Sequence, residues 1–99
     1  MTYVLSIYAV DDLDQASSYY EEKRPGLGMQ FLERFDEAIA KVVDRPESWL
    51  EYHLRTRLCM LKQFHYGIVY RLTDETIHVF GVVSLIRKPG YWANRLKAL

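Results

Sequence analysis

Two alternating runs of residues near the C-terminus constrain the fold of this 99-residue chain more than any other feature. In residues 66–72 and 77–84, β-branched and aromatic side chains recur at every second position, which is typical of half-buried strands. Thr73, Asp74 and Glu75 lie between the runs and have the length of a hairpin loop. The sequence therefore predicts an antiparallel β-hairpin.

The alternation assigns each side chain of this hairpin to one face of a sheet. The first run divides into Tyr66, Ile68, Tyr70 and Leu72 against Gly67, Val69 and Arg71. The second run divides into Ile77, Val79, Gly81 and Val83 against His78, Phe80, Val82 and Ser84.

The segment that follows the hairpin is basic and aromatic. Arg87-Lys88 precedes Pro89-Gly90, which we expect to end the strand and turn the chain, and Tyr91-Trp92 comes next. Two cations and two large rings therefore lie just beyond a rigid strand end, where functional residues are often found.

The first half of the chain has the periodicity of one strand and two helices. Residues 3–8 alternate as a short strand, and Asp11 or Asp12 offers an N-cap for a helix that continues to about Lys23. A second helix is predicted from Leu27 to Asp44, where Arg45-Pro46 ends it. The apolar stripe of this second helix consists of Leu32, Phe35, Ile39 and Val42. The short connector between the helices predicts an antiparallel αα-hairpin.

A further strand is predicted where residues 57–62 alternate, and we expect Trp49 and Leu50 to close one end of the core. The order β-α-α-β-β-β indicates an α+β fold. We expect the αα-hairpin to pack on one face of a mostly antiparallel four-stranded sheet, in a single domain spanning residues 1–99. The other face of the sheet is then open and carries arginine and aromatic side chains.

Composition favours a cytoplasmic protein. No apolar run reaches the length of a membrane span, and the N-terminus lacks a basic leader. The single cysteine, Cys59, excludes an internal disulfide framework and is interpreted as a small buried hydrophobic residue. We expect no cofactor and no metal site.

Charge is distributed unevenly although the net charge is zero. Residues 1–54 contain 5 Lys+Arg and 11 Asp+Glu, a net charge of −6, whereas residues 55–99 contain 8 and 2, a net charge of +6. The basic half is suited to a polyanion or an acidic protein partner. An equally good interpretation is that the outer faces of the helices are acidic, the outer face of the sheet is basic, and both sets of charges are simply solvated.

Several strings, in this order, resemble the RelE/ParE family of toxins from bacterial type II toxin–antitoxin systems. The string at residues 64–71, FHYGIVYR, resembles the family's F-P-Y-x-I-x-Y strand, and residues 82–92 with Arg95 resemble its closing H-x-x-R-x-P-x-x-W-x-x-R. Matching strings also occur at residues 12–31, so the resemblance covers nearly the whole chain and is closer to the ParE, or plasmid-stabilisation, branch. Two positions depart from the pattern: Ser84 replaces the usual histidine, and His65 stands where proline is common.

The resemblance implies a small toxin that a cognate antitoxin holds inactive, as a homodimer or a heterotetramer with that antitoxin. ParE-like members poison DNA gyrase, whereas RelE-like members cut messenger RNA on the ribosome. Metal-free RNA cleavage requires a base, an acid and cations around one phosphate. The candidates for that catalytic set are Arg57, Arg71, Arg87 and Tyr91.

The residues favour a protein target over RNA. Ser84 removes the most plausible general acid or base, and a chain with a pI near 6.8 is poorly suited to many phosphate contacts. Tyr, Trp and Arg are common anchors of protein interfaces. The predicted target- or antitoxin-binding residues are Arg87, Lys88, Tyr91, Trp92 and Arg95. We therefore expect a ParE-like gyrase inhibitor, with an mRNA endonuclease and an inactive antitoxin-binding relative as the alternatives.

Overall fold

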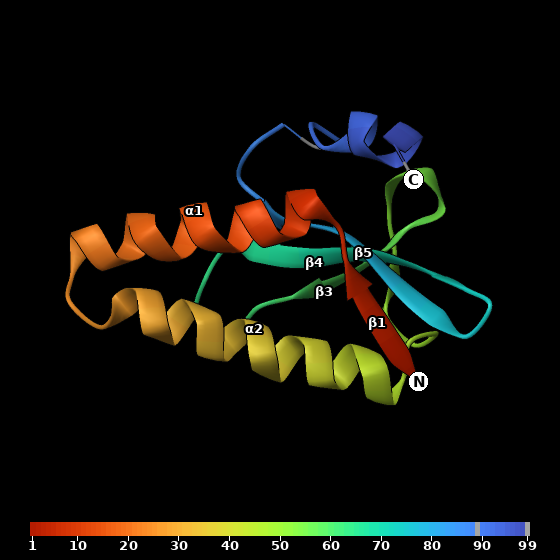
Figure 1. The fold of residues 1–99 in the computed structure, drawn as a ribbon, viewed down its shortest axis with the longest axis horizontal. Helices are drawn as coiled ribbons and strands as arrows, with labels where there is room; N and C mark the ends of the chain where they lie inside the picture. The colour runs from red at the N-terminus through yellow and green to blue at the C-terminus, as the bar shows by residue number, and fades with distance from the viewer. Residues whose placement is uncertain (89, 99) are drawn as a thin grey trace.

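The computed structural model describes residues 1–88 and 90–98. Two helices pack against one face of a five-stranded sheet (Figure 1), which confirms the predicted α+β class and αα-hairpin. The elements are β1 (Thr2–Leu5), α1 (Ile7–Lys23), α2 (Leu27–Asp44), β2 (Leu50–Glu51), β3 (Arg57–Met60), β4 (Tyr66–Thr73) and β5 (Thr76–Ser84), with 3₁₀ segments η1 (His53–Arg55) and η2 (Ala93–Ala98). In the part of the chain so described, no helix has the length and apolar character needed to cross a membrane.

The sheet has the strand order β1-β5-β4-β3-β2. Strand β1 runs parallel to β5, and every other pair is antiparallel. The predicted sheet of four mostly antiparallel strands is therefore one strand short. The missing strand is β2, whose two residues are too few to show a sequence period.

The hairpin between β4 and β5 closes with a tighter turn than predicted. Thr73 pairs with Thr76, so only Asp74 and Glu75 form the loop, with φ angles of +50° and +62°. Two successive left-handed residues are the mark of a type I′ turn, whose twist suits the flanking strands. Glutamate is not favoured in this conformation, so Glu75 holds local backbone strain.

A β-bulge in this hairpin changes the predicted faces of β5. Val69 pairs with Gly81 while Tyr70 pairs with Val79, which leaves Phe80 as an extra residue. Ile77 and Val79 share one face, as the alternation predicts, and that face meets the helices, but Val82, and not Val83, joins them in the main core. Val83 packs on the opposite face. The strict alternation predicted for residues 77–84 is therefore wrong beyond the bulge.

Helix α1 begins earlier than predicted. Ser6 is the N-cap, and its Oγ accepts a hydrogen bond from the Ala9 amide at 3.1 Å. The predicted strand over residues 3–8 ends at Leu5, and Ile7 lies in the first turn of the helix with 79% of its surface exposed. The predicted caps Asp11 and Asp12 are instead inside α1.

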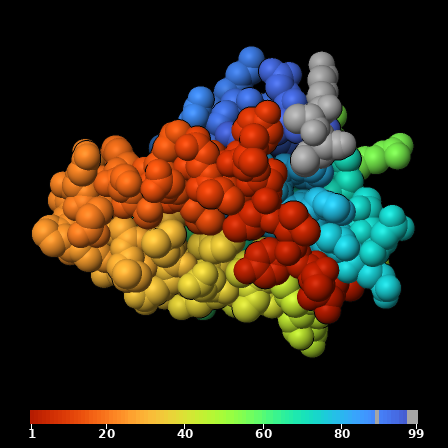
Figure 2. Space-filling view, viewed as in Figure 1, coloured from red at the N-terminus to blue at the C-terminus, as the bar shows by residue number. Residues whose placement is uncertain are grey.

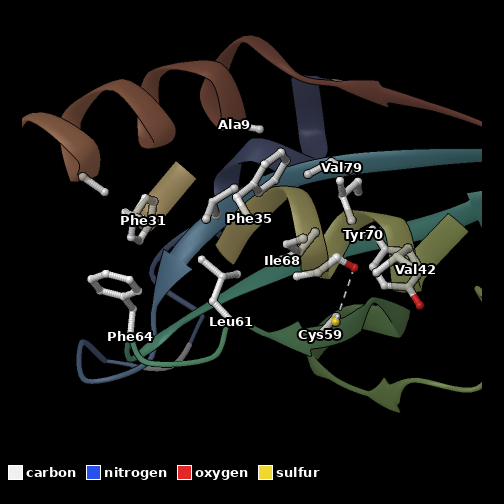
Figure 3. Close-up of a cluster of buried hydrophobic side chains, with 14 of the residues drawn as sticks. Ala9, Phe31, Phe35, Val42, Cys59, Leu61, Phe64, Ile68, Tyr70 and Val79 are labelled. Atoms are coloured by element: carbon white, nitrogen blue, oxygen red, sulfur yellow. Dashed lines mark hydrogen bonds between the residues drawn. The ribbon is translucent and has the colours of Figure 1, made fainter. Parts of the chain in front are cut away.

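The main core lies between the helix pair and the sheet (Figure 3). Its α2 side chains include Phe31, Phe35, Ile39 and Val42. From the sheet, Ile68 and Tyr70 of β4 point toward them, as the alternation predicts. Trp49 packs at the edge of this core, as predicted. Leu50 is 64% exposed, so the prediction that it also closes the end of the core is wrong.

Cys59 is buried in this core, as the sequence suggests. Burial raises the pKa of its thiol to about 11, so the thiolate that a nucleophile requires is scarce at neutral pH. Cys59 therefore serves the packing of the core.

A second, smaller core covers part of the opposite face of the sheet, which was predicted to be open. The chain after β5 (blue in Figure 1) folds back so that Trp92 packs against Leu58, Val69 and Val83. Pro89, predicted to turn the chain here, lies outside the described residues, and Gly90 has a φ of +81°. The apolar side chains on this face are thus removed from water by the chain's own C-terminal segment.

We predict that Glu75→Gly stabilises the protein by about 0.5–1 kcal/mol, because glycine adopts the left-handed conformation without a Cβ clash. Urea unfolding followed by circular dichroism measures the change. Glu47→Gly, at an exposed loop position outside the left-handed region, is the matched control and should lose stability. A Glu75→Gly protein no more stable than the unmodified chain would contradict the strain assigned to this turn.

Candidate functional site

The edge of β5 is closed by side chains where β1 ends. Strand β1 pairs with Thr76–Val79, and within residues 1–88 and 90–98 no strand lies beside the rest of β5 on that side. Ser6 Oγ donates to the Phe80 carbonyl at 3.1 Å, and the Val82 amide donates to Asp12 Oδ2 at 2.9 Å. The Ser84 amide donates to the Tyr91 hydroxyl at 3.1 Å. These three side chains satisfy backbone groups that an open edge would leave to another chain.

Asp12 also holds Arg95 in a two-point ion pair. Arg95 Nη1 lies 2.6 Å from Asp12 Oδ2, and Nη2 lies 3.1 Å from Oδ1. The Asp12 and Arg95 side chains are only 15% and 18% exposed, so solvent weakens this pair little. A Cβ on Gly81 would lie 2.5 Å from Arg95 Nη1, which explains the glycine on this strand. Arg95, predicted to bind a partner, is thus placed in an internal ion pair.

Arg87 and Lys88 remain exposed just beyond β5. The Arg87 guanidinium lies 3.9 Å from the centre of the Tyr91 ring, a cation–π contact. Because the Tyr91 hydroxyl is bound to the Ser84 amide, the ring is a fixed platform. Arg87 therefore has a preferred position while its donors stay available to a ligand.

A polar hollow of about 210 Å³ lies beside this platform, between α1 and the end of β5. Its lining includes Asp12, Gln15, Tyr19, Tyr66, Arg87 and Tyr91. Burial is the main cause that raises the pKa of Tyr66, so its hydroxyl stays protonated at neutral pH and can donate a hydrogen bond. A guanidinium and phenolic hydroxyls together are suited to a carboxylate, a phosphate or a backbone carbonyl.

Trp92 does not belong to this exposed surface. It is 2% exposed and stacks on Tyr52, with ring centres 5.9 Å apart. The expectation of an exposed Tyr-Trp pair is therefore wrong for Trp92, whose indole ring anchors the C-terminal segment to the sheet. Tyr91 is half-buried and keeps contact with the hollow.

Arg57 and Arg71 lie away from Arg87. Arg57 pairs with Tyr70, so the strand alternation starts its side chain on the face opposite to that of Arg71. The two side chains start on opposite faces of the sheet, yet both line one hollow together with Arg55. Arg57 Nη1 donates to the Trp49 carbonyl at 2.7 Å, and Arg71 Nη2 donates to the Leu54 carbonyl.

The four residues of the predicted catalytic set do not converge. Arg71 lies near the hairpin end of β4, whereas Tyr66 at the other end of β4 pairs with Ser84, next to Arg87 and Tyr91. Five residues along a strand span about 17 Å. The structure thus brings Arg87 and Tyr91 together and places Arg57 and Arg71 elsewhere.

Sequence reasoning missed the role of Asp12 and the contributions of Gln15, Tyr19 and Tyr66. Asp12 was interpreted as a helix cap, and its partner Arg95 is 83 positions away. No local pattern connects residues at that distance. The sequence offers one signal: Asp12 lies on the helix face that turns toward the core, and Arg95, which the family pattern includes, is a basic residue that could pair with it.

Comparison with known proteins gives consistent matches. Residues 3–85 match the family described as "ParE toxin of type II toxin-antitoxin system, parDE". Toxin ParE2 of Mycobacterium tuberculosis (strain CDC 1551 / Oshkosh) is 32% identical over 80 residues, which cover 80% of this chain and 76% of that protein. The ParE2 toxin of strain H37Rv gives the same figures.

A solved structure has the same fold. The chromosomal ParDE TA system from P. aeruginosa contains a chain that superposes with a TM-score of 0.76 at 15% identity. The match covers 86% of this chain and 96% of that one. At this identity the comparison demonstrates a shared fold.

We predict that Asp12→Ala lowers the free energy of unfolding by about 2–3 kcal/mol, because it leaves the Val82 amide and the Arg95 guanidinium without their acceptor. In a double-mutant cycle measured by chemical denaturation, Arg95→Met should cost at least about 1 kcal/mol less in the Asp12→Ala background. Asp11→Ala removes the same charge from an exposed neighbour and should change stability by less than about 0.5 kcal/mol. Additive losses would show that the ion pair contributes nothing to the fold.

Proposed function

Because this chain belongs to the ParE family of toxins from type II toxin–antitoxin systems, we propose that it inhibits growth by binding a protein target such as DNA gyrase. A cognate antitoxin neutralises it in the cytoplasm, where that target is found. In this proposal residues 1–99 act as one toxin domain.

The observation that supports a binding role is the exposed cation on a fixed aromatic platform. Arg87 stacks on Tyr91 at the rim of the polar hollow, and Lys88 is exposed beside it. Arginine held against an aromatic ring loses little conformational freedom when a partner binds. Arg87, Lys88 and Tyr91 are therefore the proposed contacts to the target, whereas Trp92 and Arg95 position them.

In this proposal the antitoxin neutralises the toxin by binding the same surface as the target. The hollow offers donors from Arg87 and Tyr66 but holds the Asp12 carboxylate within an internal ion pair. A segment of the antitoxin that supplies a carboxylate to Arg87 and Lys88 would cover the surface that the target needs. The toxin and antitoxin would then form the heterotetramer that the family resemblance suggests, or a simpler complex.

The geometry supports binding better than RNA cleavage. Arg57 and Arg71 are too far from Arg87 and Tyr91 to act on one phosphate, and Ser84 has no titratable group near neutral pH. His65 is exposed in a loop, and His78 pairs with Arg71 at the far end of β5. The acid, the base and the stabilising cations that cleavage requires are therefore not gathered at one point.

The test is expression without antitoxin, combined with an assay of purified protein on DNA gyrase. We expect induced cells to filament with DNA damage while translation continues, and the purified chain to inhibit supercoiling. Arg87→Ala should weaken inhibition by about tenfold or more, because a central interface arginine is lost. Arg24→Ala, an exposed arginine in the turn between the helices, should inhibit as well as the unmodified chain.

Two outcomes would contradict this proposal. An immediate stop of protein synthesis, with new cuts in ribosome-bound messages, would identify an mRNA endonuclease. Harmless expression, with no inhibition of supercoiling, would identify a relative that only pairs with its antitoxin.

A further inference from the structure

An arginine-lined groove runs around the end of the molecule that carries the β4–β5 hairpin. Three hollows of about 520, 380 and 510 Å³ lie there. The middle hollow shares the lining residues Glu47 and Leu72 with the first, and Arg55 and Arg57 with the third, so the three hollows are neighbours and are together called the groove. In Figure 2 the η1 segment (green) projects from this flank of the molecule, beside the hairpin (cyan) and away from the turn between the helices.

The groove carries more positive than negative charge. Arg45, Arg55, Arg57 and Arg71 border it, against the carboxylates of Glu47 and Glu51. The ion pair between Arg57 and Glu51 is long, at 3.9 Å, and Glu51 is exposed, so it neutralises Arg57 weakly. The groove therefore attracts anions.

The chain holds two of these guanidinium groups in place without satisfying them. Arg57 and Arg71 each donate to a loop carbonyl, of Trp49 and Leu54 respectively. A guanidinium has five N–H donors, so several remain. Arg71 Nε is buried and has no hydrogen-bond partner among residues 1–88 and 90–98. Buried donors are rarely left unpaired unless a ligand or water serves them.

The backbone of η1 is strained at the rim of the groove. Leu54 and Arg55 have φ angles of +57° and +63°, two successive left-handed residues that are not glycine. Backbone conformations of this kind cluster at active sites, ligand clamps and switch regions. Here the strained turn presents the exposed Leu54 side chain and the Arg55 guanidinium side by side.

We propose that this groove binds an extended acidic segment of a partner protein. Its carboxylates pair with Arg55, Arg57 and Arg71, and an apolar side chain contacts Leu54 or Leu72. The exposed apolar side chain of Leu54 suits a peptide, which can supply an apolar side chain of its own, better than RNA. This site lies at the opposite end of β4 from Arg87, so it does not depend on the function proposed above.

The test is a titration of the ¹⁵N-labelled full chain, followed by NMR, with a blocked hexapeptide of alternating glutamate and leucine. We expect saturable shifts centred on the amides of residues 54–57 and 71–72. A hexapeptide of glutamine and leucine should bind at least about fivefold more weakly, because charge-assisted hydrogen bonds are lost. Equal binding by that control peptide, shifts centred elsewhere, or tighter binding of a six-nucleotide single-stranded RNA would overturn the proposal.

Variants inside the groove and a matched control outside it test where the peptide binds. Arg55→Gln and Arg71→Gln should each weaken binding of the acidic peptide by about fivefold or more. Arg55 is exposed, so its replacement leaves the fold intact and the result interpretable even if Arg71→Gln unfolds. Lys62→Gln removes the same charge from an exposed position after β3 and should leave the affinity within about twofold. Equal affinities for Arg55→Gln and Lys62→Gln would show that net charge alone attracts the peptide.

Discussion

The carboxylate of Asp12 joins three parts of the chain that are distant in sequence. It accepts the Val82 amide of β5 and both Nη groups of Arg95, and it is itself carried by α1. A half-buried carboxylate without these donors would be costly, and so would an unpaired strand edge. One side chain therefore fixes the helix against the sheet and the C-terminal segment against both.

The C-terminal segment depends on this anchor and on a second one. Trp92 fills the apolar strip formed by Leu58 and Val69 on the face of the sheet opposite the helices. Between these two fixed points, the ring of Tyr91 is bound to the Ser84 amide and supports Arg87. The exposed cation of the candidate site is thus placed by buried contacts on both sides of it. Trp92 and Arg95, the last two residues of the resemblance pattern, both hold the segment in place.

Much of the fold could be predicted from the sequence because it rests on local periodicity. Helix α2 spans Leu27–Asp44, as its apolar stripe and the Arg45-Pro46 that follows it predict. The inward face of β4 follows the alternation. The predictions that were wrong concern features set by interactions between residues distant in sequence. Ser6 ends β1 because its side chain caps α1 and bonds β5, and the bulge at Phe80 reverses the faces of β5. The candidate site was half predictable: Arg87 and Tyr91 are near each other in sequence, whereas the separation of Arg57 and Arg71 required the strand register.

Hydrogen–deuterium exchange at the Val82 amide tests the central role of Asp12 most directly, since this amide donates its hydrogen bond to the Asp12 side chain and not to a neighbouring strand. We predict that Val82 exchanges within about tenfold of the rate of Ile68 in the centre of the sheet, because both open only when the fold opens. Exchange of Val82 at the rate of an unprotected peptide, while Ile68 stays protected, would show that the Asp12 carboxylate does not hold the edge of β5.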